Sequence, residues 1–99
     1  MNQAMMMRIR KMQKELEQKQ KELQDAVYTG TAGGIVSVEV KGTHEVLSVK
    51  VNKDALDSLD DLDMVEDSIV SAINDANKKI EEASQKILGP YAAGLGGLF

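Results

Sequence analysis

The 99-residue sequence contains no cysteine, no tryptophan and only one histidine. Without cysteine it can form neither disulfides nor thiolate metal sites, and it has no cysteine nucleophile. The single histidine, His44, falls in a predicted turn without a second catalytic group nearby. We therefore expect no enzymatic activity, no cofactor, no metal ion and no small-molecule substrate.

Aromatic residues and long apolar runs are also scarce. Only 3% of the residues are aromatic, so the stacking platforms used by binders of single-stranded nucleic acid are largely missing. No run approaches the ~18 apolar residues of a membrane span, and the start, MNQAMMMRIRK, lacks the apolar segment of a secretion signal. With 42% hydrophobic and 28% charged residues, the chain is expected to be one folded cytosolic domain without membrane contact.

The first 28 residues contain neither glycine nor proline and are rich in Gln, Glu, Lys, Leu and Met. Apolar residues recur in a 4-3-4 rhythm, which predicts a long amphipathic helix from about Asn2 to Val27. Such a helix is roughly 38 Å long, whereas a strand of about seven residues spans only ~23 Å, so part of the helix must overhang the sheet. We expect the overhanging apolar seam to pack against a second copy of the chain. The predicted dimer interface consists of Met5, Ile9, Met12 and Leu16.

The period changes to two after a glycine-rich stretch, residues 28–34, which can end the helix and begin an edge strand. Residues 35–40 alternate with valines on one face, and residues 46–51 alternate with Leu47, Val49 and Val51 on one face. The connection between them contains Gly42, as suits a hairpin loop. We predict an antiparallel hairpin in a three-stranded sheet that is buried on one face only.

Helical spacing returns from Val65 to Ile87, which predicts a second helix. Asp63 and Glu66 resemble a capping box at its start, and Gly89-Pro90 is expected to end it. The predicted fold is therefore α+β, with helices covering one face of a small antiparallel sheet. We expect a single domain over residues 1–90 and a flexible Gly-rich tail over residues 91–99.

The net charge of −4 is unevenly distributed. Residues 1–27 carry six basic and four acidic side chains, a net of +2, whereas the remainder carries −6. Glu15 and Glu17 are spaced to pair with Lys19 and Lys21, but no acidic residue precedes Glu15. The heptad pattern directs most of the cations away from the apolar seam. The cations that remain available to a partner are Arg8, Arg10, Lys11 and Lys14.

Two interpretations of this cationic helix face are open. A solvated helix face is the commoner use of such a pattern in an acidic protein. The alternative is contact with nucleic-acid phosphates, which requires Lys and Arg but tolerates any base sequence. The acidic run from Asp54 to Asp67 lacks the ligand spacing of a calcium loop and fits helix-start electrostatics and solubility instead.

Several segments, taken in order, resemble the YbaB/EbfC family of bacterial nucleoid-associated proteins. The resemblance covers nearly the whole chain and implies a homodimer with paired protruding helices, located at the nucleoid. It further implies binding of double-stranded DNA with little sequence preference and a role in chromosome organisation and gene regulation. This favours phosphate contact over a merely solvated helix face, and the residues that we expect to contact DNA are Arg8, Arg10, Lys11, Lys14 and Lys21. The segments that carry the resemblance are Met12-Gln13-Lys14, Gly30-Thr31-Ala32-Gly33-Gly34 followed by Ile35-Val36, Gly42, Glu66-Asp67 and Ala72-Ile73-Asn74-Asp75-Ala76.

A second function remains open at this point. The helices could bind another protein, for example one engaged in recombination or replication, with DNA contact only incidental. DNA binding would weaken steeply with increasing salt, whereas an adaptor would show little duplex affinity and a defined protein stoichiometry.

Overall fold

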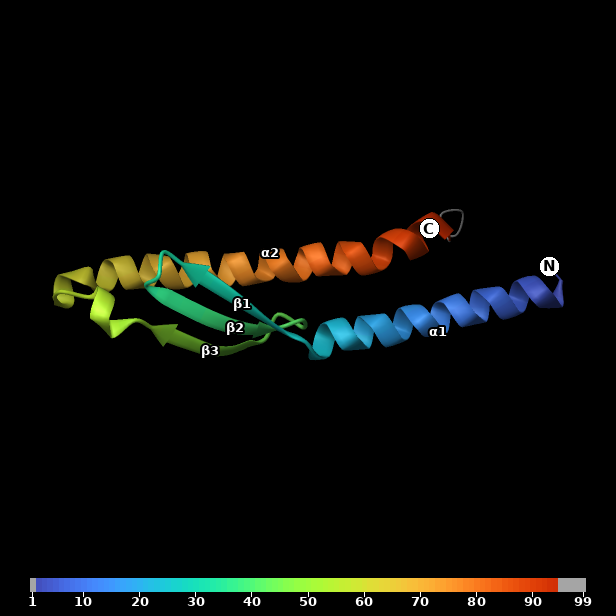
Figure 1. Ribbon diagram of the computed structural model, residues 1–99, viewed down its shortest axis with the longest axis horizontal. Coiled ribbons are helices and arrows are strands. Elements are labelled where there is room, and N and C mark those ends of the chain that lie inside the picture. The colour runs from blue at the N-terminus through green and yellow to red at the C-terminus, as the bar shows by residue number, and fades with distance from the viewer. Residues whose placement is uncertain (1, 95–99) are drawn as a thin grey trace.

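The computed structural model describes residues 2–94, an elongated α+β molecule of 70 × 20 × 15 Å (Figure 1). The expected order of a long helix, three antiparallel strands and a second long helix is confirmed. None of the helices in this range is both long and apolar enough to cross a membrane. The elements are α1 (Gln3–Asp25), β1 (Val27–Ala32), β2 (Val36–Lys41), β3 (Val46–Val51), two 3-10 turns, η1 (Lys53–Ala55) and η2 (Leu59–Asp61), and α2 (Leu62–Gly94).

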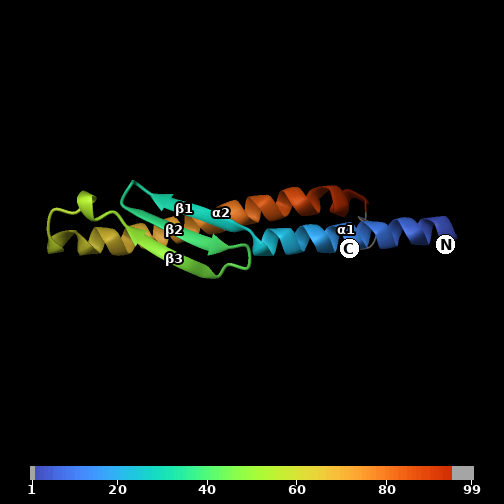
Figure 2. The ribbon, with the colours of Figure 1, turned by 60° about the horizontal axis from the view of Figure 1, so that its bottom comes forward.

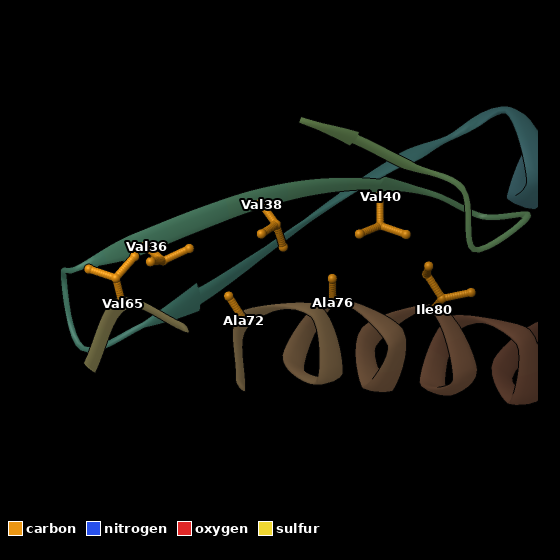
Figure 3. Close-up of a cluster of buried hydrophobic side chains, with 7 residues drawn as sticks. All are labelled: Val36, Val38, Val40, Val65, Ala72, Ala76 and Ile80. Carbon is orange, nitrogen blue, oxygen red and sulfur yellow. The ribbon is translucent and has the colours of Figure 1, made fainter. Parts of the chain in front are cut away.

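The sheet has the strand order β1-β2-β3, with both neighbouring pairs antiparallel. Its inner face carries Val36, Val38 and Val40 of β2, which are buried against α2 as the alternating pattern predicts (Figure 3). Apolar side chains that leave water in this way supply the main favourable term for folding. The core therefore lies between the central strand and one helix.

The third strand is less buried than its pattern predicts. Val49 lies opposite Val38 and so shares the inner face, but it is 44% exposed. The register also shifts between Glu39 and Val40, so that Val46, rather than Leu47, lies opposite Val40. The prediction of one continuously buried face is therefore wrong for β3, because α2 packs mainly over β1 and β2 (Figure 2).

Small residues allow α2 to cross β1 closely. A side chain at Gly30 would collide with the backbone carbonyl of Ala72 and would lie 2.7 Å from the Ala76 nitrogen. Ala72 and Ala76 are themselves fully buried. Gly30 is therefore required for the approach of helix to strand, whereas Gly33 and Gly34 adopt positive φ angles in the turn that follows β1.

Of the two long helices in residues 2–94, α2 alone covers the sheet, and the prediction that both do so is wrong. A single extended residue, Ala26, separates α1 from β1, so the chain has no loop with which to fold α1 back over the sheet. The Gly42 N–H donates to the Ala26 carbonyl over 3.0 Å, which ties this junction to the β2–β3 turn. As a result, α1 points away from the sheet and runs antiparallel to the C-terminal part of α2 (Figures 1 and 2).

The second helix continues to Gly94, so the prediction that it ends at Gly89-Pro90 is wrong. Proline removes one backbone donor and favours a kink, and a helix can pass it when packing on both sides compensates. Ile87 before Pro90 and Tyr91 after it are both half-buried, which provides such packing. The boundary expected at residue 90 therefore falls inside α2, and the last part of the expected tail, residues 95–99, lies outside the described residues.

The start of α2 also differs from the prediction. The capping box is formed by Ser58 and Asp61 rather than by Asp63 and Glu66. The Asp61 carboxylate accepts from the backbone N–H groups of Asp57 and Ser58, at 2.7 and 3.2 Å. The 3-10 turn η2 leads directly into α2, so the helical segment begins earlier than its apolar periodicity indicates.

Candidate nucleic-acid interface

Together, α1 and residues 78–94 of α2 form a projection from the sheet, which we call the arm. Within α1 every residue is exposed except for a narrow stripe of half-buried residues, namely Ile9, Met12, Leu16 and Leu23. The adjoining part of α2 offers half-buried Ile87, whereas buried Ile80 belongs to the core beneath β2. These residues repeat at helical spacing, so the two helices lie side by side on apolar stripes and leave their remaining faces to solvent. The figures show this pairing from two directions (Figures 1 and 2).

The predicted DNA contacts all lie on the arm. Arg8, Arg10, Lys11, Lys14 and Lys21 are exposed. Over residues 2–94, no carboxylate lies within 4.0 Å of any of these cations. They are thus available to an external anion.

The ion pairs expected within α1 do not form. Neither Glu15 with Lys19 nor Glu17 with Lys21 approaches within ion-pair distance in the described residues. Long, exposed side chains gain little from such a pair, because water screens the attraction and fixing two chains costs entropy. Lys21 is consequently no more neutralised than the four cations that precede it.

Charge is separated along the molecule. The arm, counted as residues 1–27 and 78–94, carries nine basic and six acidic side chains, a net of +3, whereas residues 28–77 carry −7. The most acidic part, residues 54–67, lies at the end of the long axis opposite the start of α1 (Figure 1). At physiological ionic strength the Debye length is only ~8 Å, so the acidic end is largely screened from a polyanion at the tip of a 70 Å molecule.

The seam predicted to hold a dimer is partly used within one chain. Ile9, Met12 and Leu16 are half-buried beside α2, while Met5 remains 50% exposed. Met6 and Met7 are exposed as well. The part of the seam that is left for a second copy is therefore concentrated at the first turn of α1.

One polar cluster was not predicted from the sequence. The Thr31 N–H donates to the Asp75 carboxylate over 3.0 Å, and the Lys79 ammonium donates to the Thr29 carbonyl over 2.7 Å. Lys79 and Asp75 also form an ion pair at 3.5 Å. The hydrogen bond from Thr31, followed by the charge of Lys79, holds the pKa of Asp75 below its usual value.

The i,i+4 spacing of Asp75 and Lys79 signals an ion pair on a helix, but no local pattern indicates that both side chains reach the edge of β1. Lys79 is therefore held by the sheet, in contrast to the cations of α1. His44 has a positive φ in the β2–β3 turn, and its Nδ1 lies 2.9 Å from the Asn77 side-chain oxygen. This placement confirms it as a polar turn residue. Residues 2–94 bring together no group of three or more side chains suited to holding a metal ion.

Comparison with known proteins identifies relatives along almost the entire chain. A family model described as "YbaB/EbfC DNA-binding family" matches residues 1–95. A nucleoid-associated protein of Roseiflexus castenholzii is 42% identical over 86 residues, covering 87% of this chain and 85% of the relative. A nucleoid-associated protein of Rhodococcus jostii is 39% identical over 95 residues, covering 95% of this chain and 83% of the relative.

The fold has a counterpart among solved structures. The crystal structure of an uncharacterized protein from Helicobacter pylori superimposes with a TM-score of 0.70 at 25% sequence identity. The match covers 92% of this chain and 97% of the Helicobacter chain. The projecting helices and the sheet thus belong to one architecture shared by both chains.

Proposed function

The chain belongs to the YbaB/EbfC DNA-binding family, and we propose that it binds double-stranded DNA as a homodimer with little sequence preference. The family is one of nucleoid-associated DNA-binding proteins and not an enzyme family. In this proposal the protein contributes to chromosome organisation, and to gene regulation where its binding competes with that of other proteins.

The observation that supports the proposal best is the unpaired cationic face of α1. Arg8, Arg10, Lys11 and Lys14 lie on the arm with no ion-pair partner among the described residues, and Lys21 extends the set towards the sheet. Cations of this kind bind phosphates and release the counterions condensed on DNA, which favours binding at low salt. Contacts to phosphates alone carry no base information, so tolerance of sequence follows.

A homodimer would double this cationic surface. The predicted interface of Met5, Ile9, Met12 and Leu16 remains a candidate, with Met5 as its most accessible member. Two arms on one dimer could contact the same duplex or two duplexes, and either arrangement would serve chromosome organisation.

Binding to a duplex of arbitrary sequence across a salt series tests the proposal. We expect each phosphate contact to contribute about −0.9 to the slope of log affinity against log salt concentration. The double substitution Arg10→Ala and Lys14→Ala should lower both the affinity and the steepness of this slope. Its control, Lys50→Ala with Lys53→Ala, removes the same charge from the sheet end of the molecule and should change the slope much less.

Equal effects of the two double substitutions would overturn the assignment of the site to α1. A wild-type protein with no duplex affinity at low salt, but with a defined stoichiometry toward another protein, would instead support the adaptor function.

A further inference from the structure

The acidic end of the molecule carries exposed apolar side chains as well as charge. Leu59 of η2 is 82% exposed, and Leu62 and Met64 at the start of α2 are 48% and 39% exposed. Large apolar side chains that remain in water normally occur singly on a protein surface, but these three fall within six consecutive residues. The neighbouring Val65 is buried in the core. This segment therefore supplies apolar groups to the core and, in addition, leaves an apolar outer face without a partner.

The carboxylates around this apolar face are unpaired. Residues 54–67 contain seven acidic and no basic side chains. Asp61 is partly satisfied, because it accepts hydrogen bonds from the backbone N–H groups of Asp57 and Ser58. The other six are exposed, and within residues 2–94 no Lys or Arg lies within 4.0 Å of them. A surface of this composition fits a partner that offers apolar side chains and positive charge together.

The tip of the arm offers both. Met7 is 65% exposed, and Lys11 and Lys14 follow it at i+4 and i+7, so all three lie on one face of α1. Met6, which is 43% exposed, and Arg10 lie beside this face at the same i,i+4 spacing. The half-buried stripe of α1 that faces α2 is not part of it. The arm tip is therefore complementary to the acidic end in both polarity and charge.

These two surfaces cannot meet within one molecule. They lie at opposite ends of a molecule 70 Å long (Figure 1). A single linking residue, Ala26, joins α1 to β1, and the packing of α2 on the sheet fixes the acidic end. A contact between them must therefore join two molecules.

We propose that the acidic end of one copy binds the arm tip of another, so that copies associate head to tail. Leu59 and Leu62 pack against Met6 and Met7 of the neighbouring copy, and the surrounding carboxylates pair with its cations. Apolar contacts at the centre and charged groups at the rim are the usual arrangement of a protein interface. Because each copy offers one surface of each kind, the contact is heterologous and can repeat along a chain of molecules. It is distinct from the two-fold homodimer contact and leaves the seam of α1 unused.

Head-to-tail association competes with DNA for the same cations. Arg10, Lys11 and Lys14 cannot contact phosphates and the carboxylates of a neighbouring copy at the same time. Free protein would then hold part of its arms in self-association, and an added duplex would release them. This inference goes beyond the proposed function and does not depend on it, because the contact forms without DNA.

Static light scattering without DNA tests the contact. At ~0.01 M salt, where the Debye length is ~30 Å, the average mass should rise with protein concentration. At ~1 M salt, where it is ~3 Å, the mass should no longer depend on concentration. The same measurement on the variants below locates the two surfaces.

Two charge-reversal variants should each weaken association about 10-fold or more at low salt. Lys11→Glu with Lys14→Glu alters the arm tip, and Asp57→Lys with Asp60→Lys alters the acidic end. An equimolar mixture of the two should recover association, because one variant supplies an intact acidic end and the other an intact arm. The control Glu81→Lys with Glu82→Lys makes the same change of charge on exposed carboxylates of α2 and should retain association.

An uncharged substitution tests the apolar part. Leu59→Gln leaves the charge unchanged and should weaken association about 10-fold, as expected when a buried leucine is lost from an interface. The matched control is Val70→Gln, which alters a 60% exposed valine of α2 and should have no effect. Circular dichroism should show that all variants fold.

Three results would overturn the proposal: a mass that does not respond to salt or concentration, reversal variants that associate like the wild type, or a mixture that recovers nothing. The last result would point to a contact between like surfaces. A protein that assembles head to tail but binds no duplex would disprove the proposed function while supporting this inference. Duplex binding by a protein whose arm tips and acidic ends do not associate would do the opposite.

Discussion

At the scale of single residues, the clearest result is how differently two similar cations are used. Lys79 is tied to the Thr29 carbonyl and to Asp75, whereas Lys14 has no carboxylate within 4.0 Å in the described part of the chain. Both are exposed lysines on helices, and the local sequence distinguishes Lys79 only by the acidic Asp75 four residues before it, not by any contact with β1. The difference arises because only α2 passes beside the edge of β1.

The lowered pKa of Asp75 gives a prediction about stability and pH. The folded protein binds a proton at Asp75 less readily than the unfolded chain does, because the Thr31 N–H and Lys79 favour the ionised carboxylate. The resulting stabilisation should be fully present above the unfolded pKa, near 3.8, and be lost as pH falls through the lower pKa of the folded state. Asp75→Asn should therefore reduce the free energy of unfolding at pH 6 more than at pH 3.

Urea unfolding at several pH values measures this difference. Asp67→Asn serves as the control, since no hydrogen bond or ion pair is made to its side chain within residues 2–94. A cost of Asp75→Asn that does not vary with pH would show that the Thr31 contact does not depend on the ionised carboxylate.

At the scale of elements, the close crossing of α2 over β1 positions the rest of the molecule. Gly30 faces Ala72 and Ala76 at this crossing, and the three residues together leave no room for a larger side chain. The sequence pattern indicates Gly30 only as part of a glycine-rich turn. Its role in packing depends on a helix that lies more than 40 residues further along the chain.

We predict that Gly30→Ala lowers the free energy of unfolding by about 3 kcal/mol, because the added methyl group forces α2 away from the sheet. Chemical denaturation of the purified variant measures this loss. Gly89→Ala is the matched control: its added methyl group meets nothing within 4 Å, so stability should change by less than about 1 kcal/mol. Equal effects of the two substitutions would mean that the crossing is not tightly packed.

At the scale of the whole molecule, the separation of charge determines which end attracts a polyanion such as DNA and which end repels it. The arm carries +3 and residues 28–77 carry −7, with the most acidic segment at the end opposite the start of α1 (Figure 1). A net charge of −4 is therefore a poor guide to the field near the arm. The salt concentration determines the distance over which the acidic end repels DNA.

This arrangement predicts that repulsion by the acidic end depends on salt. Asp57→Lys with Asp60→Lys should tighten duplex binding at ~0.01 M salt, where the Debye length is ~30 Å, and have little effect at ~0.15 M, where it is ~8 Å. Fluorescence anisotropy with a labelled duplex measures both affinities. The neutral pair Asp57→Asn with Asp60→Asn should produce a smaller change of the same sign. An equal gain at both salt concentrations would contradict this explanation, because a screened repulsion must weaken as the salt concentration rises.

The sequence by itself determined the order of the elements, the buried valines of β2 and the cations that α1 exposes. Each depends on periodicity, which places residues close in the chain on a common face whatever lies elsewhere. Only the tertiary structure decided that α1 leaves the sheet after one linking residue, Ala26, and that α2 continues past Pro90. It also decided that the Asp75 and Lys79 side chains reach backbone groups of β1. These outcomes depend on contacts between residues far apart in the chain, which local spacing does not encode.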